Sequence, residues 1–224
     1  MYLKRKADAY LNAWKSDPNR SPLIIKGPRQ VGKTETIDYF AAHNYRSVVE
    51  INFVEEPKYR AITADGYGAN TIVRNISLID PAKKFIPGDT LIFFDEIQAH
   101  PDIATALKFF KIDGKYDVIC SGSMLGISYK QIESNSVGYK TDYEMRSLDF
   151  EEFLWARGYD EAVIESMFTH LCDATPFSEV EMNVFSTAFM DYCVLGGMPA
   201  VVASHIRTGT FEGTLQLQRQ LILD

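Results

Sequence analysis

The sequence predicts an α/β protein in which a three-layer parallel sheet is followed by a helical region. Short apolar runs rich in β-branched residues alternate with segments of helical periodicity over the first part of the chain. Beyond about residue 147 the strand-like runs stop and apolar residues recur only at helical spacing. We therefore expect a core of residues 1–146 and a helical lid subdomain of residues 147–224.

The composition is that of a globular protein with a sizeable core. The chain has 224 residues, of which 46% are hydrophobic and 24% are charged. Its net charge of -7 disfavours broad attraction to nucleic acid, although a local patch is not excluded. No apolar run approaches the roughly 20 residues that cross a bilayer, and the N-terminus has no signal-peptide pattern. We expect a cytoplasmic protein without a membrane partner.

The cysteines and histidines show no metal-binding pattern. Cys120, Cys172 and Cys193 are far apart in apolar surroundings, so we expect buried thiols in a reducing compartment. The four histidines lack the spacing of zinc ligands.

Each expected element follows from a local pattern. A first amphipathic helix should run from Tyr2 to about Lys15 and end at the turn of residues 17–19. The expected strands are residues 23–25, 47–53, 90–94 and 117–121, and we take residues 117–121 as the last clear core strand. The expected helices between them are residues 34–41, 55–64, 72–79 and a segment that starts at residue 101.

Capping patterns mark the helices of the second region. Asp149 and Glu152 resemble a capping box, and Ser178 and Glu181 form one before a helix that should stop at Gly196. The last stretch, from residue 211 onward, is helical and leucine-rich and ends abruptly. We expect the natural chain to continue beyond residue 224.

A phosphate-binding loop stands between the first strand and the helix that follows it. Residues 27–34 fit G-x-x-x-x-G-K-[ST], the Walker A pattern, in the strand–loop–helix context that this pattern requires. Successive backbone N–H groups and the helix dipole would converge on an anion there. A glycine-rich turn before a helix is the competing interpretation, and it explains the fixed Lys-Thr pair poorly. The residues expected to bind the nucleotide are Gly27, Pro28, Arg29, Gln30, Val31, Gly32, Lys33, Thr34 and Glu35.

Individual side chains of this loop have different expected roles. Lys33 would reach the β- and γ-phosphates, and the Thr34 hydroxyl would be a ligand of Mg²⁺. The side chain of Arg29 should point outward or contact a neighbouring acid rather than touch phosphate.

Two acids follow the apolar run of residues 91–94. Asp95 should emerge at the carboxyl edge of the sheet beside the loop and hold Mg²⁺ through water, as in a Walker B motif. Glu96 would act as general base on the attacking water. Two solvated acids at a strand end are the alternative interpretation.

Small polar residues after the strand of residues 117–121 are candidates for a γ-phosphate sensor. Ser121 or Ser123 could hydrogen-bond the γ-phosphate or the lytic water, and the residues do not decide between the two; Ser123 is the serine that we expect among the catalytic residues. A simple turn is the other interpretation. For Gln98 and His100, a structural role is at least as well supported as a catalytic one.

The strings GPRQVGKT, LIFFDEIQ, CSGSM, SLDFEEFL and VLGGMPAVV together resemble the AAA+-like P-loop ATPases of bacteria and archaea, in which a C-terminal domain of unknown function follows the AAA domain. This resemblance covers almost the whole chain. It implies an ATPase with a five-stranded parallel core, in which the sensor strand separates the P-loop strand from the Walker B strand. It also implies a helical lid, where Pro199 of Gly197-Met198-Pro199 would touch the nucleotide base. A helix stop followed by a proline turn explains the same residues.

Two departures from the family pattern limit what the resemblance implies. Family members carry a Gly-Arg pair after the sensor, whereas residues 137–140 read Val-Gly-Tyr-Lys, so an arginine finger there is in doubt. Arg146 and Arg157 remain as candidates. The domain that follows in the family is also absent or cut off in this sequence.

These patterns favour an Mg²⁺-dependent ATPase that couples its nucleotide state to lid movement. The rival interpretation is a slow, nucleotide-gated binding module that needs a partner to hydrolyse ATP. A small-molecule kinase is disfavoured, because the adjacent acids are typical of water-activating enzymes and no acceptor signature is visible. ATP is expected over GTP because no guanine motif is present and because the resemblance is to a family of ATPases. The oligomeric state stays open, with a homo-oligomer as one option.

Overall fold

The computed structural model describes residues 1–123 and 138–223. By their contacts, the residues divide into two compact units. The sheet unit comprises Ala9–Arg29 and Lys33–Met145, and the helical unit comprises Met1–Asp8, Gln30–Gly32 and Arg146–Asp224. The loop between the first strand and its helix therefore contributes residues to both units.

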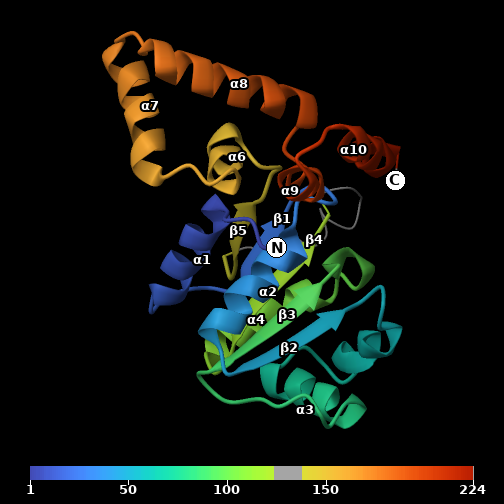
Figure 1. Cartoon of the computed structure of the whole chain (residues 1–224). Helices are drawn as coiled ribbons and strands as arrows, with labels where there is room; N and C mark the ends of the chain where they lie inside the picture. Colours follow the sequence, from blue (N-terminus) through green and yellow to red (C-terminus); the bar gives the residue numbers. More distant parts are fainter. Residues whose placement is uncertain (124–137, 224) are drawn as a thin grey trace. The chain divides into compact units, whose positions relative to one another are not determined.

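The sheet unit contains a five-stranded, wholly parallel sheet in the order β2-β3-β4-β1-β5 (Figure 1). All six residues of β3 are buried, as expected for a strand covered on both faces. The predicted α/β class is confirmed, and so is the position of β4 between β1 and β3. The strands are β1 (Leu23–Lys26), β2 (Ser47–Asn52), β3 (Thr90–Asp95), β4 (Asp117–Gly122) and β5 (Thr141–Glu144).

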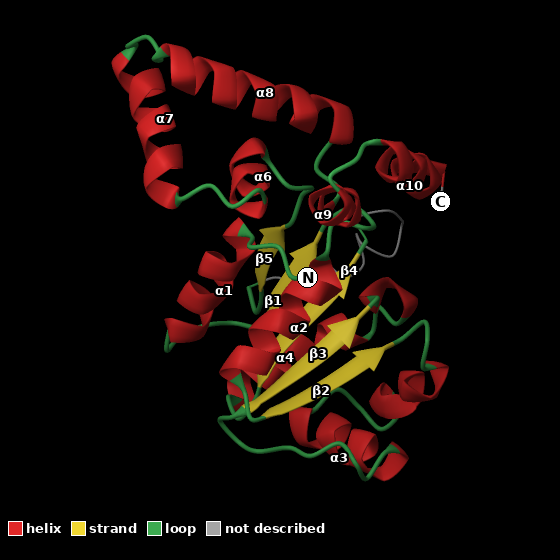
Figure 2. Cartoon of the chain, in the orientation of Figure 1, coloured by secondary structure: helices red, strands yellow, loops and turns green. Residues whose placement is uncertain are grey.

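Helices flank this sheet and complete its core (Figure 2). On one face, Ile92 and Phe94 of β3 pack in one cluster with residues of α3 and α4. The rings of Trp14 in α1 and Phe40 in α2 pack edge to face, 6.4 Å apart. The elements are α1 (Lys6–Ser16), α2 (Lys33–Asn44), η1 (Pro57–Thr63), α3 (Ala69–Ile79), η2 (Ile97–Ala99) and α4 (Ile103–Asp113).

The helical unit is built from five further helices and two small apolar clusters. Both predicted capping boxes are present, at Asp149 before α6 and at Ser178 before α8, and α8 ends at Gly196 as predicted. None of the helices in the two described ranges combines the length and apolar character that crossing a bilayer requires. The helices are α6 (Phe150–Ala156), α7 (Glu161–Asp173), α8 (Glu179–Leu195), α9 (Pro199–Thr208) and α10 (Glu212–Leu223).

Three expectations from the sequence are corrected. The first helix begins at Lys6 instead of Tyr2, because the backbone N–H of Arg5 is already capped by the Asp8 carboxylate. The strand β5, which we did not identify from its residues, pairs with β1; its residues alternate between half-buried and exposed, so no apolar run marks it. Cys120 is buried, but Cys172 and Cys193 are exposed, because they lie on the solvent-facing sides of α7 and α8.

Candidate functional site

The loop that follows β1 has a backbone that only glycine permits at its ends. A Cβ atom on Gly27 would collide with the carbonyl oxygen of Met145, whose own N–H donates to the Lys26 carbonyl at 2.7 Å. Gly32 has φ +86, in the left-handed region that favours glycine. These two constraints explain why both glycines of the motif stand where they do.

Two residues of the sequence motifs have positive φ angles although they are not glycine. Among the described residues other than glycine, positive φ angles occur at Gln30 (64), Glu96 (54) and Ala174 (52). Ala174 caps the C-terminal end of α7, a common place for this conformation. Gln30 lies in the loop and Glu96 follows β3, and non-glycine residues in this conformation cluster at functional sites.

Lys33 is a buried cation at the first position of α2. Its Nζ donates to the carbonyl oxygens of Gly27 at 2.9 Å and Pro28 at 2.7 Å. Burial lowers the pKa of Lys33, while the nearby carboxylates of Glu96 and Asp95 act in the opposite direction. The ammonium group is thus held against the inner side of the loop.

Asp95, at the carboxyl end of β3, is the most highly bonded acid of the site. Its Oδ2 accepts hydrogen bonds from Thr34 Oγ1 at 3.3 Å and Asn52 Nδ2 at 3.2 Å. Its Oδ1 accepts from the hydroxyl of Ser121 and from the backbone N–H of Glu96 at 2.9 Å. With four donors around a carboxylate that is 4% exposed, the side chain has one orientation available.

Glu96 is half-buried beside Asp95, and its carboxylate accepts a hydrogen bond from the amide of Gln98. The other end of that amide, Gln98 Oε1, is buried without a hydrogen-bond partner among the described residues. A Cβ on Gly122 would lie 2.6 Å from this oxygen, so Gly122 leaves the space in which the Gln98 side chain lies. The position of the Glu96 carboxylate therefore depends on Gln98 and, through it, on β4.

The two candidate sensor serines differ in their surroundings. Ser121 is fully buried in β4 and donates to Asp95, whereas Ser123 follows the end of β4 and is 5% exposed. His100 is buried against Phe53, with its Nε2 3.0 Å from the hydroxyl of Thr63, which is a structural role. Of the other loop residues, Pro28, Arg29 and Glu35 are exposed, in keeping with an outward direction for the Arg29 side chain.

Pro199 belongs to the helical unit, as do the loop residues 30–32. It is buried at the first turn of α9, and its ring lies 3.5 Å from where a Cβ on Gly32 would be. A Cβ on Gly197 would collide with the carbonyl oxygen of Leu148, and the N–H of Leu148 donates to the Gly197 carbonyl at 2.7 Å.

Of the arginine-finger candidates, Arg157 forms an ion pair with Asp191. Residue 137, in the segment that departs from the family pattern, lies outside the described residues.

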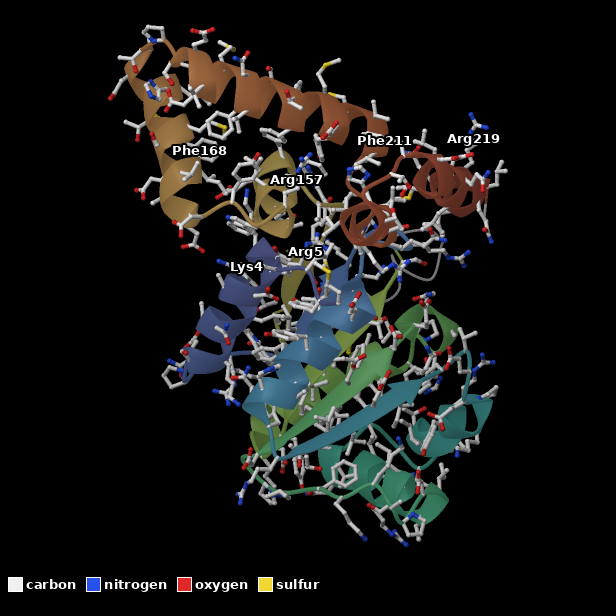
Figure 3. All side chains as sticks on the ribbon, viewed as in Figure 1. Lys4, Arg5, Arg157, Phe168, Phe211 and Arg219 are labelled. Carbon is white, nitrogen blue, oxygen red and sulfur yellow. The ribbon has the colours of Figure 1, made fainter. Side chains whose placement is uncertain are left out.

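Sequence reasoning missed Arg5, which is 4% exposed in the segment before α1 (Figure 3). Within the helical unit, its guanidinium donates to the carbonyl oxygens of Val31 at 2.7 Å and Arg146 at 2.6 Å, and to Glu152 Oε1 at 3.1 Å. No local signal distinguishes this arginine from a solvated residue of an amphipathic helix, because its partners are far away in the sequence.

Asn52 was also missed, although a signal for it exists. It ends β2 opposite Asp95 in the register of the parallel sheet. Because the carboxyl ends of parallel strands meet at one edge, a polar residue there could have been predicted to face Asp95.

The strand order, the loop between β1 and α2, and the acids after β3 together define the α/β fold of a P-loop NTPase. Within that class, the chain belongs to the AAA domain family, whose match covers residues 19–154, more than half of the sequence. Membership of this family supports nucleotide binding of the ATPase type.

Other comparisons give distant likenesses. PCH-2 from C. elegans has a solved structure that shares 11% sequence identity with this chain and has a TM-score of 0.42. The match covers 79% of this chain and 50% of that one. The ORC1 protein of Aeropyrum pernix, solved in complex with DNA, is 13% identical, with a TM-score of 0.44, over 74% of this chain and 54% of that one. The chain thus spans about half the length of these proteins. The comparison with curated proteins finds no match.

Proposed function

We propose that the protein is an Mg²⁺-dependent ATPase whose chemistry is performed by Lys33, Thr34, Asp95 and Glu96. The observation that carries this proposal is the hydrogen bond of 3.3 Å between Thr34 Oγ1 and Asp95 Oδ2. It joins the end of the loop to the end of β3, so the two side chains expected to hold the metal ion meet at one point.

The residues present fit Mg²⁺ rather than a metal held by protein groups alone. Within residues 1–123 and 138–223, no group of three or more His, Cys, Asp or Glu side chains could hold a metal ion. Mg²⁺ commonly takes one or two protein carboxylates together with substrate phosphates and waters. Thr34 and Asp95 would hold it, and the bound ion would neutralise charge on the phosphates.

The loop and Lys33 are suited to binding the triphosphate. The Lys33 ammonium donates to two loop carbonyls, and none of the carboxylates in residues 1–123 and 138–223 accepts a hydrogen bond from it. Such a cation can exchange carbonyl contacts for phosphate oxygens, which are stronger acceptors. This binding accounts for the Walker A pattern at Gly27–Thr34.

Glu96 would take the proton from the attacking water. Its carboxylate is oriented by the Gln98 amide, and its strained backbone turns it out of the line of β3. Since the hydroxyl of Ser121 is engaged by Asp95, Ser123 is our candidate for the contact with the γ-phosphate.

Nucleotide state would act on the helical unit through the loop itself. Residues 30–32 belong to that unit by their contacts, whereas residues 27–29 and 33–34 belong to the sheet unit. We infer that phosphate binding by the loop, part of which belongs to the helical unit, changes the conformation of that unit, as in a lid. Pro199, whose ring packs beside Gly32, is our candidate for the contact with the base.

A second candidate function is a slow, nucleotide-gated switch. Arg157 is engaged by Asp191 and lies over the Phe153 ring at 5.8 Å, so it is not poised as an arginine finger. If the arginine must come from a partner, the isolated chain would bind ATP tightly and turn it over slowly.

Phosphate release by the purified chain with ATP and Mg²⁺ distinguishes these functions. Steady release that is lost in Glu96→Gln, with ATP binding retained, supports the ATPase. Tight binding without turnover supports the switch.

Thermal unfolding checks the binding mode itself. At ATP roughly 100-fold above its Kd, binding should add about 2.7 kcal/mol to the free energy of unfolding, which raises the melting temperature by several degrees. We expect Lys33→Ala to abolish this shift, because it removes the cation of the loop. A wild-type response in Lys33→Ala would refute the role given to Lys33.

A further inference from the structure

An apolar groove of about 560 Å³ lies in the helical unit, among α6, α7 and α8. Its apolar lining comes from all three helices: Phe150 from α6, Phe168 and Leu171 from α7, and Phe185 and Phe189 from α8. Figure 3 shows Phe168 on the α7 arm of this arrangement. The groove plays no part in the nucleotide chemistry proposed above.

Part of the apolar lining of the groove is open to solvent. Phe168 is 41% exposed, Leu171 63% and Phe189 50%. The helix α8 also exposes Met190 and Val194 on other sides, so it is apolar around much of its circumference. Helices of this kind are normally buried, and contiguous exposed apolar patches mark interaction sites.

The groove lies in a strongly acidic part of the chain. Residues 149–195, which contain α6, α7 and α8, carry a single Lys or Arg residue, Arg157, and one histidine, His170. Their net charge is therefore more negative than the -7 of the whole chain. The acidic residues of this stretch are Asp149, Glu151, Glu152, Asp160, Glu161, Glu165, Asp173, Glu179, Glu181 and Asp191.

Basic side chains of the protein's own N-terminal segment already bind part of this acidic rim. Lys6, which lines the groove, pairs with Asp149 and with Glu151 at 2.7 Å. Lys4 pairs with Glu161 and lies 4.7 Å from the centroid of the Trp155 ring. The rim therefore accepts lysine side chains in the geometry that the structure shows.

Further acids of the rim are open to a partner. Glu165 and Glu179 are exposed and form no ion pair with any described residue. Glu165 stands three residues before Phe168 in α7, and Glu179 stands three residues before the groove-lining Met182 in α8. Residues three apart lie on neighbouring faces of a helix, so these carboxylates flank the apolar lining.

We propose that this groove binds a basic amphipathic helix of a partner protein. Leucine-like side chains of such a helix, repeating at helical spacing, would fill the groove, and its lysines or arginines would meet the acidic rim. A second copy of this chain is a poorer occupant, because the same acidic surface would face itself and like charges in contact are unfavourable.

A synthetic peptide tests the proposal directly. The probe is a fluorescein-labelled helical peptide of about 14 residues, four turns, with leucines on one face and lysines on the other. We expect saturable binding by fluorescence anisotropy that weakens with added salt. The double variant Phe168→Ser/Leu171→Ser should bind the probe about tenfold or more weakly, because it removes two anchors. The charge variant Glu165→Gln/Glu179→Gln should bind about threefold more weakly and with a smaller salt dependence.

Matched controls distinguish specific binding in the groove from nonspecific hydrophobic binding. Leu78→Ser, on the exposed face of α3 in the sheet unit, should leave binding unchanged. A peptide with the same leucines and glutamates in place of lysines should not bind. Circular dichroism and melting temperature verify that each variant is folded.

Three results would overturn the proposal. In the first, the lysine and glutamate peptides bind equally well. In the second, Leu78→Ser loses as much binding as the groove variant Phe168→Ser/Leu171→Ser. In the third, the folded wild type does not bind the probe. Concentration-dependent dimerisation that Phe168→Ser/Leu171→Ser abolishes, without peptide binding, would assign the groove to a second copy instead.

Discussion

Arg5 is the residue whose role is least evident from its place in the chain. Its guanidinium binds the Val31 carbonyl of the phosphate loop and pairs with buried Glu152, which also accepts the backbone N–H of Lys6 at 2.7 Å. We interpret Arg5 as a positioning residue that fixes the middle of the loop, with Glu152 holding the guanidinium in place.

Variants of this pair separate charge burial from loop positioning. Arg5→Met should lower the free energy of unfolding by about 3–5 kcal/mol, because it leaves the Glu152 carboxylate buried without its cation. In Arg5→Met/Glu152→Gln, where no charge is left unpaired, much of this stability should return. The affinity for a fluorescent ATP analogue should stay weakened in both variants, because both lack the hydrogen bond from the Arg5 guanidinium to the Val31 carbonyl. Wild-type affinity in the folded double variant would show that Arg5 has a structural role only.

His100 predicts how stability depends on pH. Burial lowers the pKa of His100, so the unfolded chain binds a proton more readily than the folded one. Stability should therefore decrease as the pH falls below about 6.5, the value for an unperturbed histidine, until the folded pKa is passed. Urea unfolding at a series of pH values should show a flatter profile in His100→Gln than in the wild type.

The matched control for this experiment is His43→Gln, at an exposed histidine on α2. If His100→Gln and His43→Gln give the same profile as the wild type, burial of His100 has no influence on acid stability.

How far single residues could be predicted depends on how local their signal is. Lys33, Thr34, Asp95 and Glu96 were predicted as site residues from short motifs, and the structure brings Thr34 and Asp95 into contact. Arg5 could not be identified, because its burial is produced by Glu152, which only the folded chain brings near.

At the scale of elements, the α8 capping box has a measurable effect. Ser178 Oγ accepts the backbone N–H of Glu181, and the Glu181 carboxylate accepts that of Ser178 at 2.8 Å. Ser178→Ala should destabilise the start of α8 by about 1 kcal/mol, because it removes an acceptor from the first turn. Hydrogen exchange of the amides that follow Ser178 should accelerate accordingly. Thr187→Ala, which removes an exposed hydroxyl in mid-helix, should leave their exchange unchanged.

Elements were predictable where one physical signal dominated. The buried strand β3 and the capped helix α8 carry clear apolar and capping patterns, and both formed as expected. The strand β5 has four residues of mixed polarity, and its strand state depends on its pairing with β1. Such pairing depends on tertiary structure, so it cannot be predicted from the local β-propensity of the four residues.

At the scale of the whole molecule, the division of the loop between two units predicts a broad response to nucleotide. Because Gln30–Gly32 belong to the helical unit and Lys33 to the sheet unit, ATP should slow hydrogen exchange in both. Peptides from α9 and from β4 should both gain protection when ATP and Mg²⁺ are added. Lys33→Ala should show neither effect. Protection confined to the sheet unit would contradict a coupling of nucleotide binding to the helical unit.

The positions of the three cysteines allow conformational changes within the helical unit to be measured. Cys172 on α7 and Cys193 on α8 are exposed, whereas Cys120 is buried inside the sheet unit. A spin-labelling reagent should therefore react with the first two thiols of the natural chain and spare the third. Dipolar spectroscopy would then report the separation of the two helical arms as a distribution, with and without each ligand, and no engineered attachment point would be needed.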